Sequence, residues 1–230
     1  MQKDLTAFLS GFITPERLAL FNKIIEYRTC YLTVVLEDIY QSQNASAVLR
    51  TCDCFGIQNV HVIENRNEFN VDTQVSLGAS KWLTISKYNN TDNNSLGAIR
   101  QLKDDGYRII ATAPHANDVD LEDFDLAKGK SALVFGSELP GISNIIMDEA
   151  DEFLKIPMVG FTESFNISVS VAIVLHHLSY KLRNSKDIEW RLSEAEKKSI
   201  KLNWLRNTIK SSKLLEEKFR EMNAKTTYDR

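Results

Sequence analysis

Hydrophobic residues along the chain form two alternating patterns: short apolar runs of strand length, and longer stretches with helical spacing. The short runs lie at residues 32–37, 59–64, 82–86, 107–112 and 131–135. Runs that are apolar at nearly every position are typical of strands buried on both faces of a parallel sheet. The helical stretches between them end at glycines such as Gly56 and Gly106, as helices commonly do. The alternation predicts an α/β fold with a mainly parallel sheet and helices on both faces.

Both ends of the chain also have helical patterns. Thr14 followed by Pro15 is typical of a helix start, because a hydroxyl can cap the first turn and proline fits the first helical position. A long, nearly all-apolar helix is predicted over residues 164–182. We therefore predict three parts. They are an N-terminal helical segment at residues 1–30, an α/β domain at 31–185 and a basic helical extension at 186–230.

The charge of the chain is unevenly distributed. The whole sequence of 230 residues has a net charge of −3, with 28 basic and 31 acidic side chains. Residues 186–230 contain 12 of the basic and 8 of the acidic side chains, a net of +4, which leaves −7 for the rest. A basic extension on an acidic body indicates either an anionic partner or a solvated helix face with mixed charges.

Composition limits the class of protein further. Hydrophobic residues make up 43% and charged residues 26%, as in ordinary globular domains. No apolar run has the roughly 18 residues that span a bilayer, and we expect a cytoplasmic protein without a membrane partner. The 3 cysteines and 4 histidines lack the spacing of a zinc site, so no metal is expected.

A glycine-containing loop at residues 136–143 follows a predicted strand and precedes a helix. Its spacing is that of a phosphate-binding P-loop, but Ile142 stands where the lysine belongs. Without that cation nothing meets the terminal phosphates, which argues against an ATPase. The glycines would still let the backbone approach another ligand closely, and Glu138 could accept hydrogen bonds from it. A plain turn is the alternative.

Two other segments combine small polar side chains with apolar helices. Residues 156–169 contain a proline and a glycine, and Ser164 there is either a helix cap or a ligand contact. In residues 44–56, Asn44 and Arg50 lie under two helical turns apart. An arginine in an otherwise apolar helix usually pairs with a carboxylate, but it can also hold a phosphate through two parallel hydrogen bonds.

Together and in this order, the three segments resemble the SpoU (TrmH) family of RNA 2′-O-ribose methyltransferases within the SPOUT superfamily. The matching patterns are N-x-S-A-x-x-R-T-x-D-x-x-G at residues 44–56, F-G-x-E-x-x-G-I-S at 135–143 and I-P-M-x-G-x-x-x-S-x-N-x-S-V at 156–169. The resemblance is greatest to the branch that methylates guanosine 18 of tRNA. It implies a deep C-terminal trefoil knot, a homodimer, S-adenosylmethionine as the methyl donor and tRNA as the substrate.

The resemblance also implies roles for individual residues at matching positions. The residues implied to contact the cofactor are Thr112, Gly136, Ile156 and Phe165. Those implied to form the active site are Arg50, Asn44, Glu138, Ser164 and Asn166, with Arg50 acting across the dimer interface. Arginine is too weak an acid to serve readily as a general base, so Arg50 is expected either to take the proton or to hold phosphate and stabilise the developing alkoxide.

The sequence departs from close relatives just before the first motif. Relatives commonly have Lys-Pro-His there, whereas this chain has glutamine, serine and glutamine at residues 41–43. The basic residue that near relatives carry after the glutamate at 138 is also absent. The lysines of the C-terminal extension would then have to supply the missing RNA contacts. Two alternatives stay open: a methyltransferase of the same fold that acts on ribosomal RNA, and a non-catalytic RNA-binding homologue.

Overall fold

The computed structural model describes residues 4–91, 93–112, 118–137 and 140–228, which form two compact units. The α/β unit comprises Thr29–Trp190, and the helical unit comprises Met1–Arg28 with Arg191–Arg230. The strands are β1 (Leu32–Glu37), β2 (Asn59–Ile63), β3 (Thr84–Tyr88), β4 (Arg108–Ala111), β5 (Val119–Asp120), β6 (Ser131–Phe135) and β7 (Glu152–Lys155). The helices are α1 (Leu5–Ser10), α2 (Pro15–Ile25), α3 (Ser42–Cys54), α4 (Thr73–Ser76), α5 (Asn94–Asp104), α6 (Asn144–Glu149), α7 (Ile167–Asn184), α8 (Glu194–Thr208) and α9 (Ser212–Tyr228).

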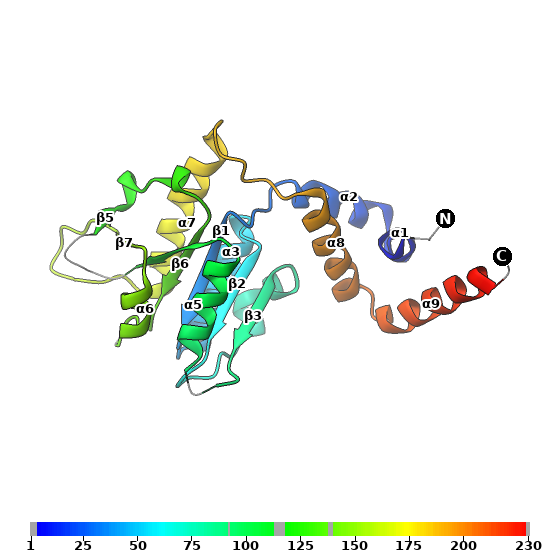
Figure 1. Ribbon diagram of the computed structural model, residues 1–230, viewed down its shortest axis with the longest axis horizontal. Helices are drawn as coiled ribbons and strands as arrows, with labels where there is room; N and C mark the ends of the chain where they lie inside the picture. The colour runs from blue at the N-terminus through cyan, green and yellow to red at the C-terminus, as the bar shows by residue number, and fades with distance from the viewer. Residues whose placement is uncertain (1–3, 92, 113–117, 138–139, 229–230) are drawn as a thin grey trace. The chain divides into compact units, whose positions relative to one another are not determined.

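A seven-stranded sheet with the order β3-β2-β1-β6-β4-β7-β5 is the centre of the α/β unit (Figure 1). All its strand pairs are parallel, which confirms the expectation of a mainly parallel sheet. Strands β1 and β6 are neighbours, with Leu36 in register with Phe135, and every residue of both strands is buried. This is why their sequences are almost continuously apolar. Because all strands run the same way, the sheet has one carboxyl edge, where strands end, and one amino edge, where they begin.

Helices cover both faces of the sheet and bury two cores. Val34 and Leu36 of β1 face one core, which they share with α3 and α7. Val35 faces the opposite core, which it shares with α5 and α6. In Figure 1, α5 and α6 lie in front of the strands, while α3 and α7 lie behind them. Alternate side chains of one strand thus support two helical layers.

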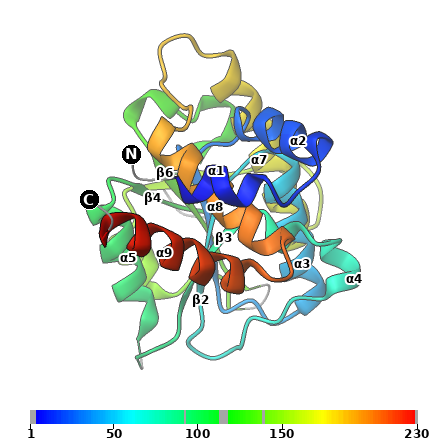
Figure 2. The same cartoon turned by 90° about the vertical axis from the view of Figure 1, so that its right-hand side faces the viewer.

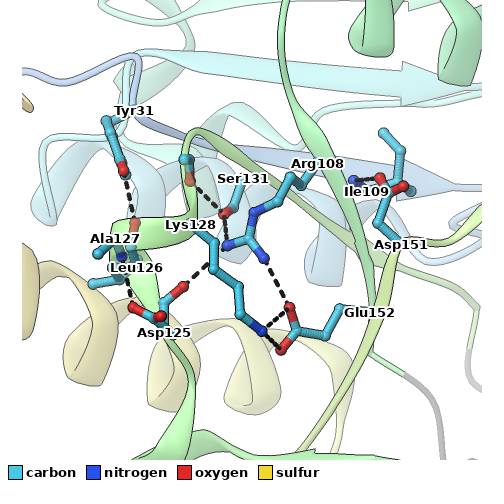
Figure 3. Close-up of polar contacts among 11 residues, drawn as sticks. Tyr31, Arg108, Ile109, Asp125, Leu126, Ala127, Lys128, Ser131, Asp151 and Glu152 are labelled. Atoms are coloured by element: carbon cyan, nitrogen blue, oxygen red, sulfur yellow. Dashed lines mark hydrogen bonds and ion pairs between the residues drawn. The ribbon is translucent and has the colours of Figure 1, made fainter.

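The amino edge is closed by a cluster of hydrogen bonds and ion pairs (Figure 3). Arg108, the first residue of β4, donates to Glu152 at 2.7 Å, to Ser131 at 3.2 Å and to the carbonyl of Asp125 at 3.1 Å. Lys128 adds a second cation 3.3 Å from Glu152. These contacts join the first residues of β4, β6 and β7, so the cluster aligns three strands where they begin.

The helical unit brings the two ends of the chain together. Its helices α1, α2, α8 and α9 pack on one another, and Figure 2 shows α1 beside α8. Phe21 of α2 packs edge-on against Trp204 of α8, with 5.4 Å between ring centroids. Lys197 and Lys198 of α8 form ion pairs with Glu26 at 2.8 Å and Asp4 at 2.9 Å. Much of the positive charge on α8 is therefore neutralised within this unit.

The predicted elements and the observed ones differ in two places that matter for the site. The strand expected at 82–86 is Thr84–Tyr88, because Trp82 follows the short 3₁₀ turn Ala79–Lys81. The apolar helix expected from residue 164 begins only at Ile167, because Asn166 caps it by accepting a hydrogen bond from the backbone N–H of Ser168. Ser164 therefore lies in a loop. Within the described residues, no helix is long and apolar enough to traverse a bilayer.

Candidate active site

A cavity of about 510 Å³ opens at the carboxyl edge of the sheet. Its floor comes from the ends of three strands, with Thr112 after β4, Phe135 at the end of β6 and Ile156 after β7. Two loops, 136–143 and 157–166, form its walls, and α7 closes one side. In parallel α/β folds, ligands bind beyond the carboxyl ends of the strands. The cavity therefore lies where this architecture places a binding site.

The first wall is the loop between β6 and α6. The backbone N–H of Gly141 donates to the carbonyl of Ser137 at 3.0 Å, which holds these two residues of the loop together. Gly141 has a φ of +69°, and a Cβ on Gly136 would collide with the backbone of Gly141. Both positions thus require glycine. The hydroxyl of Ser137 is buried against the cavity and has no hydrogen-bond partner among the described residues.

The second wall is the loop that precedes α7. It brings Ser164, Phe165 and Asn166 to the cavity, while Val159 and Phe161 are fully exposed on its outer side. The side-chain oxygen of Asn166 accepts from the backbone N–H of Ser168 at 2.9 Å. The helix cap therefore also orients the amide of Asn166 at the cavity wall.

Asn44 joins the first motif to this wall. The Asn166 amide nitrogen donates to the side-chain oxygen of Asn44 at 3.1 Å, and Asn44 donates to the side chain of Gln41 at 3.0 Å. Arg50, further along α3, is exposed and has no hydrogen bond or ion pair among the described residues. It does not line the cavity of its own chain.

The structure therefore places the residues that the sequence analysis singled out in three ways. The predicted residues that line the cavity are Thr112, Gly136, Ile156, Ser164, Phe165 and Asn166. Asn44 is attached to it through Asn166, whereas Arg50 lies apart from it. Glu138 lies outside the described residues.

Comparison with known proteins identifies the family. The model of the SpoU rRNA Methylase family matches residues 31–176, which include all three motifs and the whole sheet. The chain belongs to this family.

Relatives of this SpoU family member agree in sequence and fold. A tRNA (guanosine(18)-2′-O)-methyltransferase from Borreliella burgdorferi is 45% identical over 208 residues, covering 90% of this chain and 93% of that protein. The crystal structure of the Aquifex aeolicus TrmH/SpoU tRNA modifying enzyme superposes with a TM-score of 0.73 at 29% identity, covering 85% of this chain and 98% of that one. An AdoMet-bound rRNA methyltransferase from Sinorhizobium meliloti shares the fold, with a TM-score of 0.58 at 21% identity over 69% of this chain and 59% of that one.

The sequence analysis missed four polar residues of the SpoU cavity: Ser137, Lys155, Glu163 and Ser170 all line it. The first three adjoin the predicted residues Gly136, Ile156 and Ser164, so a search that included the neighbours of each predicted residue would have found them. Ser170 lies about one helical turn beyond Asn166 on α7. Among the described residues, no group of three histidine, cysteine, aspartate or glutamate side chains could hold a metal ion.

Proposed function

We propose that this protein transfers a methyl group from S-adenosylmethionine to the ribose 2′-oxygen of guanosine 18 in tRNA. The observation that carries the proposal is the similarity to the tRNA (guanosine(18)-2′-O)-methyltransferase of Borreliella burgdorferi. That protein is 45% identical over 90% of this chain. The cavity supports it, because two of the three motifs line it and the third is hydrogen-bonded to it.

The cavity suits S-adenosylmethionine. The buried hydroxyl of Ser137 lacks a partner among the described residues, and a polar ligand would supply one. Apolar walls from Phe135, Ile156 and Phe165 can hold the adenine ring. Thr112 and Gly136 line the same cavity and would hydrogen-bond to the cofactor through their backbone groups. When bound, S-adenosylmethionine supplies a methyl group activated by its sulfonium charge, so the protein needs no metal for the transfer.

The chain's own residues would align the ribose and stabilise the charge on its 2′-oxygen, whose proton is lost to solvent as the methyl group is transferred. Asn44 and Asn166 hold each other in a fixed orientation beside the cavity, which provides hydrogen-bonding groups for the ribose or its neighbouring phosphate. The planar guanidinium of Arg50 would bind phosphate in a bidentate manner and stabilise charge that develops on the 2′-oxygen. Ser164 and Glu138 would complete the active site.

A homodimer would bring Arg50 to this cavity. Arg50 is exposed and lies apart from the cavity of its own chain. The loop of the second wall exposes Val159 and Phe161, and Val169 at the start of α7 is also exposed. Neighbouring apolar side chains of this kind are typical of protein interfaces. We propose that a second copy covers them and supplies its Arg50 to the cavity. We further propose that the two wall loops belong to a deep trefoil knot.

Transfer of tritiated methyl from S-adenosylmethionine to unmodified tRNA transcripts tests the function. A transcript with 2′-deoxyguanosine at position 18 is the matched control, and unmodified ribosomal RNA runs in parallel. We expect label in tRNA that disappears in the deoxy control. Label only in ribosomal RNA would keep the chemistry but refute the tRNA substrate. S-adenosylmethionine binding without transfer to either RNA would indicate a non-catalytic RNA-binding protein.

A further inference from the structure

Glu37 is a buried carboxyl group that the proposed chemistry does not use. It is the last residue of β1 and is only 2% exposed, at the carboxyl edge of the sheet. A carboxyl group in such a place is costly unless hydrogen bonds satisfy its oxygens. Glu37 accepts three: two from Ser143, at 2.7 Å each from the backbone N–H and the hydroxyl, and one from the hydroxyl of Ser95.

Ser143 is where the first wall loop of the cavity ends. Its hydroxyl also accepts from the backbone N–H of Ile146, so it caps the start of α6. The other end of the loop leaves β6 at Phe135, which is in register with Leu36, the residue before Glu37. The loop is therefore attached to β1 at both ends, by the strand ladder at Phe135 and by Glu37 at Ser143.

The surroundings of Glu37 hold its side chain in place. Ser95 lies in the first turn of α5 and accepts a hydrogen bond from Asn65 at 2.8 Å. The next residue, Asp38, has a φ of +52°, and its carboxyl oxygen accepts from the backbone N–H of Asn65 at 2.7 Å and of Arg66 at 2.8 Å. Glu37 thus connects the wall loop to β1 and to the first turn of α5.

We propose that Glu37 is a positioning residue for the cofactor, which acts by holding Ser143 and so keeping Gly141 and Ile142 in place at the cavity. The residues of the loop 136–143 which line the cavity include Gly136, Ser137, Gly141 and Ile142, the last directly before Ser143. Release of Ser143 would let this wall widen, and the backbone contacts to S-adenosylmethionine would be lost first. This inference rests on cofactor binding by the proposed function, but not on the identity of the RNA.

The test compares Glu37→Gln with Glu152→Gln in the full chain. Glutamine keeps the size of Glu37 but places an NH₂ group where one oxygen accepted a hydrogen bond. Glu152 is the matched control, since it is a largely buried carboxyl group with several polar contacts at the opposite edge of the same sheet. Calorimetry measures the Kd of S-adenosylmethionine and of S-adenosylhomocysteine, thermal unfolding measures stability, and hydrogen exchange reports on the Ser143 amide.

We expect Glu37→Gln to raise both Kd values about tenfold, the size expected for loss of one or two hydrogen bonds, and to speed exchange of the Ser143 amide. Glu152→Gln should lower the unfolding temperature while leaving both Kd values within about twofold of wild type. An unchanged Kd in Glu37→Gln would overturn the proposal. So would an equal rise in Glu152→Gln, because it would reflect general loss of stability.

A second pair of variants covers the case in which Glu37→Gln does not fold. Ser143→Ala and Ser95→Ala each remove one hydroxyl that donates to the same oxygen of Glu37. Only Ser143 belongs to the wall loop, so its variant should weaken cofactor binding several-fold more than Ser95→Ala. Equal effects would refute the proposal. If wild type binds the cofactor but methylates no RNA, the proposed function fails while this comparison still decides the role of Glu37.

Discussion

At the amino edge of the sheet, charged side chains bond to one another, whereas at the carboxyl edge the chain leaves polar groups open to the cavity. Arg108 has three acceptors and Glu152 two cations, although Nε of Arg108 has no acceptor among the described residues. At the carboxyl edge, Ser137 has no partner within the described residues. The same strands reach both edges, so the difference lies in the residues at their two ends and in the loops that join them. The contacts at the amino edge stabilise the sheet, whereas the groups at the carboxyl edge can still form hydrogen bonds with a ligand.

The contrast predicts that changes at the two edges have separate effects. Substitutions at the amino edge should change the free energy of unfolding and spare binding. Substitutions around the cavity should change binding and turnover and spare stability. The following experiments test whether effects on stability and effects on binding are separate.

The largest expected effect is that of Arg50→Ala on turnover. Loss of the guanidinium removes phosphate binding and stabilisation of the developing alkoxide, so kcat should fall about a hundredfold to a thousandfold with an unchanged unfolding temperature. Arg50→Lys keeps the charge but loses the planar fork, and near-wild-type turnover in it would contradict the bidentate role. Mixing Arg50→Ala with Asn166→Ala chains should restore some activity if Arg50 acts across a dimer. A failure of mixed dimers to regain activity would place Arg50 in its own chain's site.

At the opposite edge, Arg108→Ala should mainly affect stability. It leaves Glu152 without its 2.7 Å ion pair in a largely buried position. Because Lys128 remains 3.3 Å from Glu152, the cost should be about 2 kcal/mol, the size of a lost hydrogen bond to a charged group, to be measured by urea unfolding. Calorimetric binding of S-adenosylmethionine to the folded variant should match wild type. Weaker binding would show that the two edges are coupled through β4.

An intermediate effect on stability is expected from a change of pH, through a buried histidine in β2. Burial lowers the pKa of His61 to about 4 from its usual 6.5. The unfolded chain therefore takes up the proton first as pH falls, and stability present above pH 6.5 is lost progressively down to about pH 4. By pH 5 the loss should be about 2 kcal/mol in urea unfolding. The variant His61→Gln should lack this contribution. An equal loss in that variant would assign the acid sensitivity to other groups.

The smallest effect concerns the lysines of the helical unit. Lys197 and Lys198 are engaged with acidic side chains, whereas Lys210 and Lys213 are exposed and form no ion pair within the described residues. If this unit contacts RNA, the double variant Lys210→Ala with Lys213→Ala should reduce the slope of log affinity against log salt by about 1 to 2. Lys197→Ala should leave the slope nearly unchanged. Equal slopes in all variants would remove the extension from RNA binding.

Much of the fold could be predicted from the sequence, because buried parallel strands leave an apolar pattern that depends only on local residues. The strands at 32–37 and 131–135 were predicted at their observed bounds. The start of α7 was not predicted correctly, since serine and asparagine are both good helix caps. The sequence alone does not show that Asn166, rather than Ser164, caps this helix.

The candidate site was predictable as far as its motifs extend. Six predicted residues line one cavity, five of them in the motifs, but the neighbouring Ser137 stands at a motif position that accepts any residue. Glu37 was read as the end of a strand, because its partner Ser143 is 106 residues away along the chain. Under the proposed function, Arg50 reaches the active site of a second chain. A local sequence pattern specifies neither a contact between residues far apart in the chain nor a contact between two chains.

Because the helical unit draws on both ends of the chain, it is completed last during translation. Helix α2 emerges early, but its partner Trp204 follows only after the whole α/β unit has been made. At about 5 to 20 residues per second, that interval lasts on the order of ten to thirty seconds. An 11-residue helix is too short to be stable alone, so α2 waits largely unstructured on the nascent chain. Translation arrested before α8 would therefore leave a folded α/β unit that carries an N-terminal segment open to proteases and chaperones.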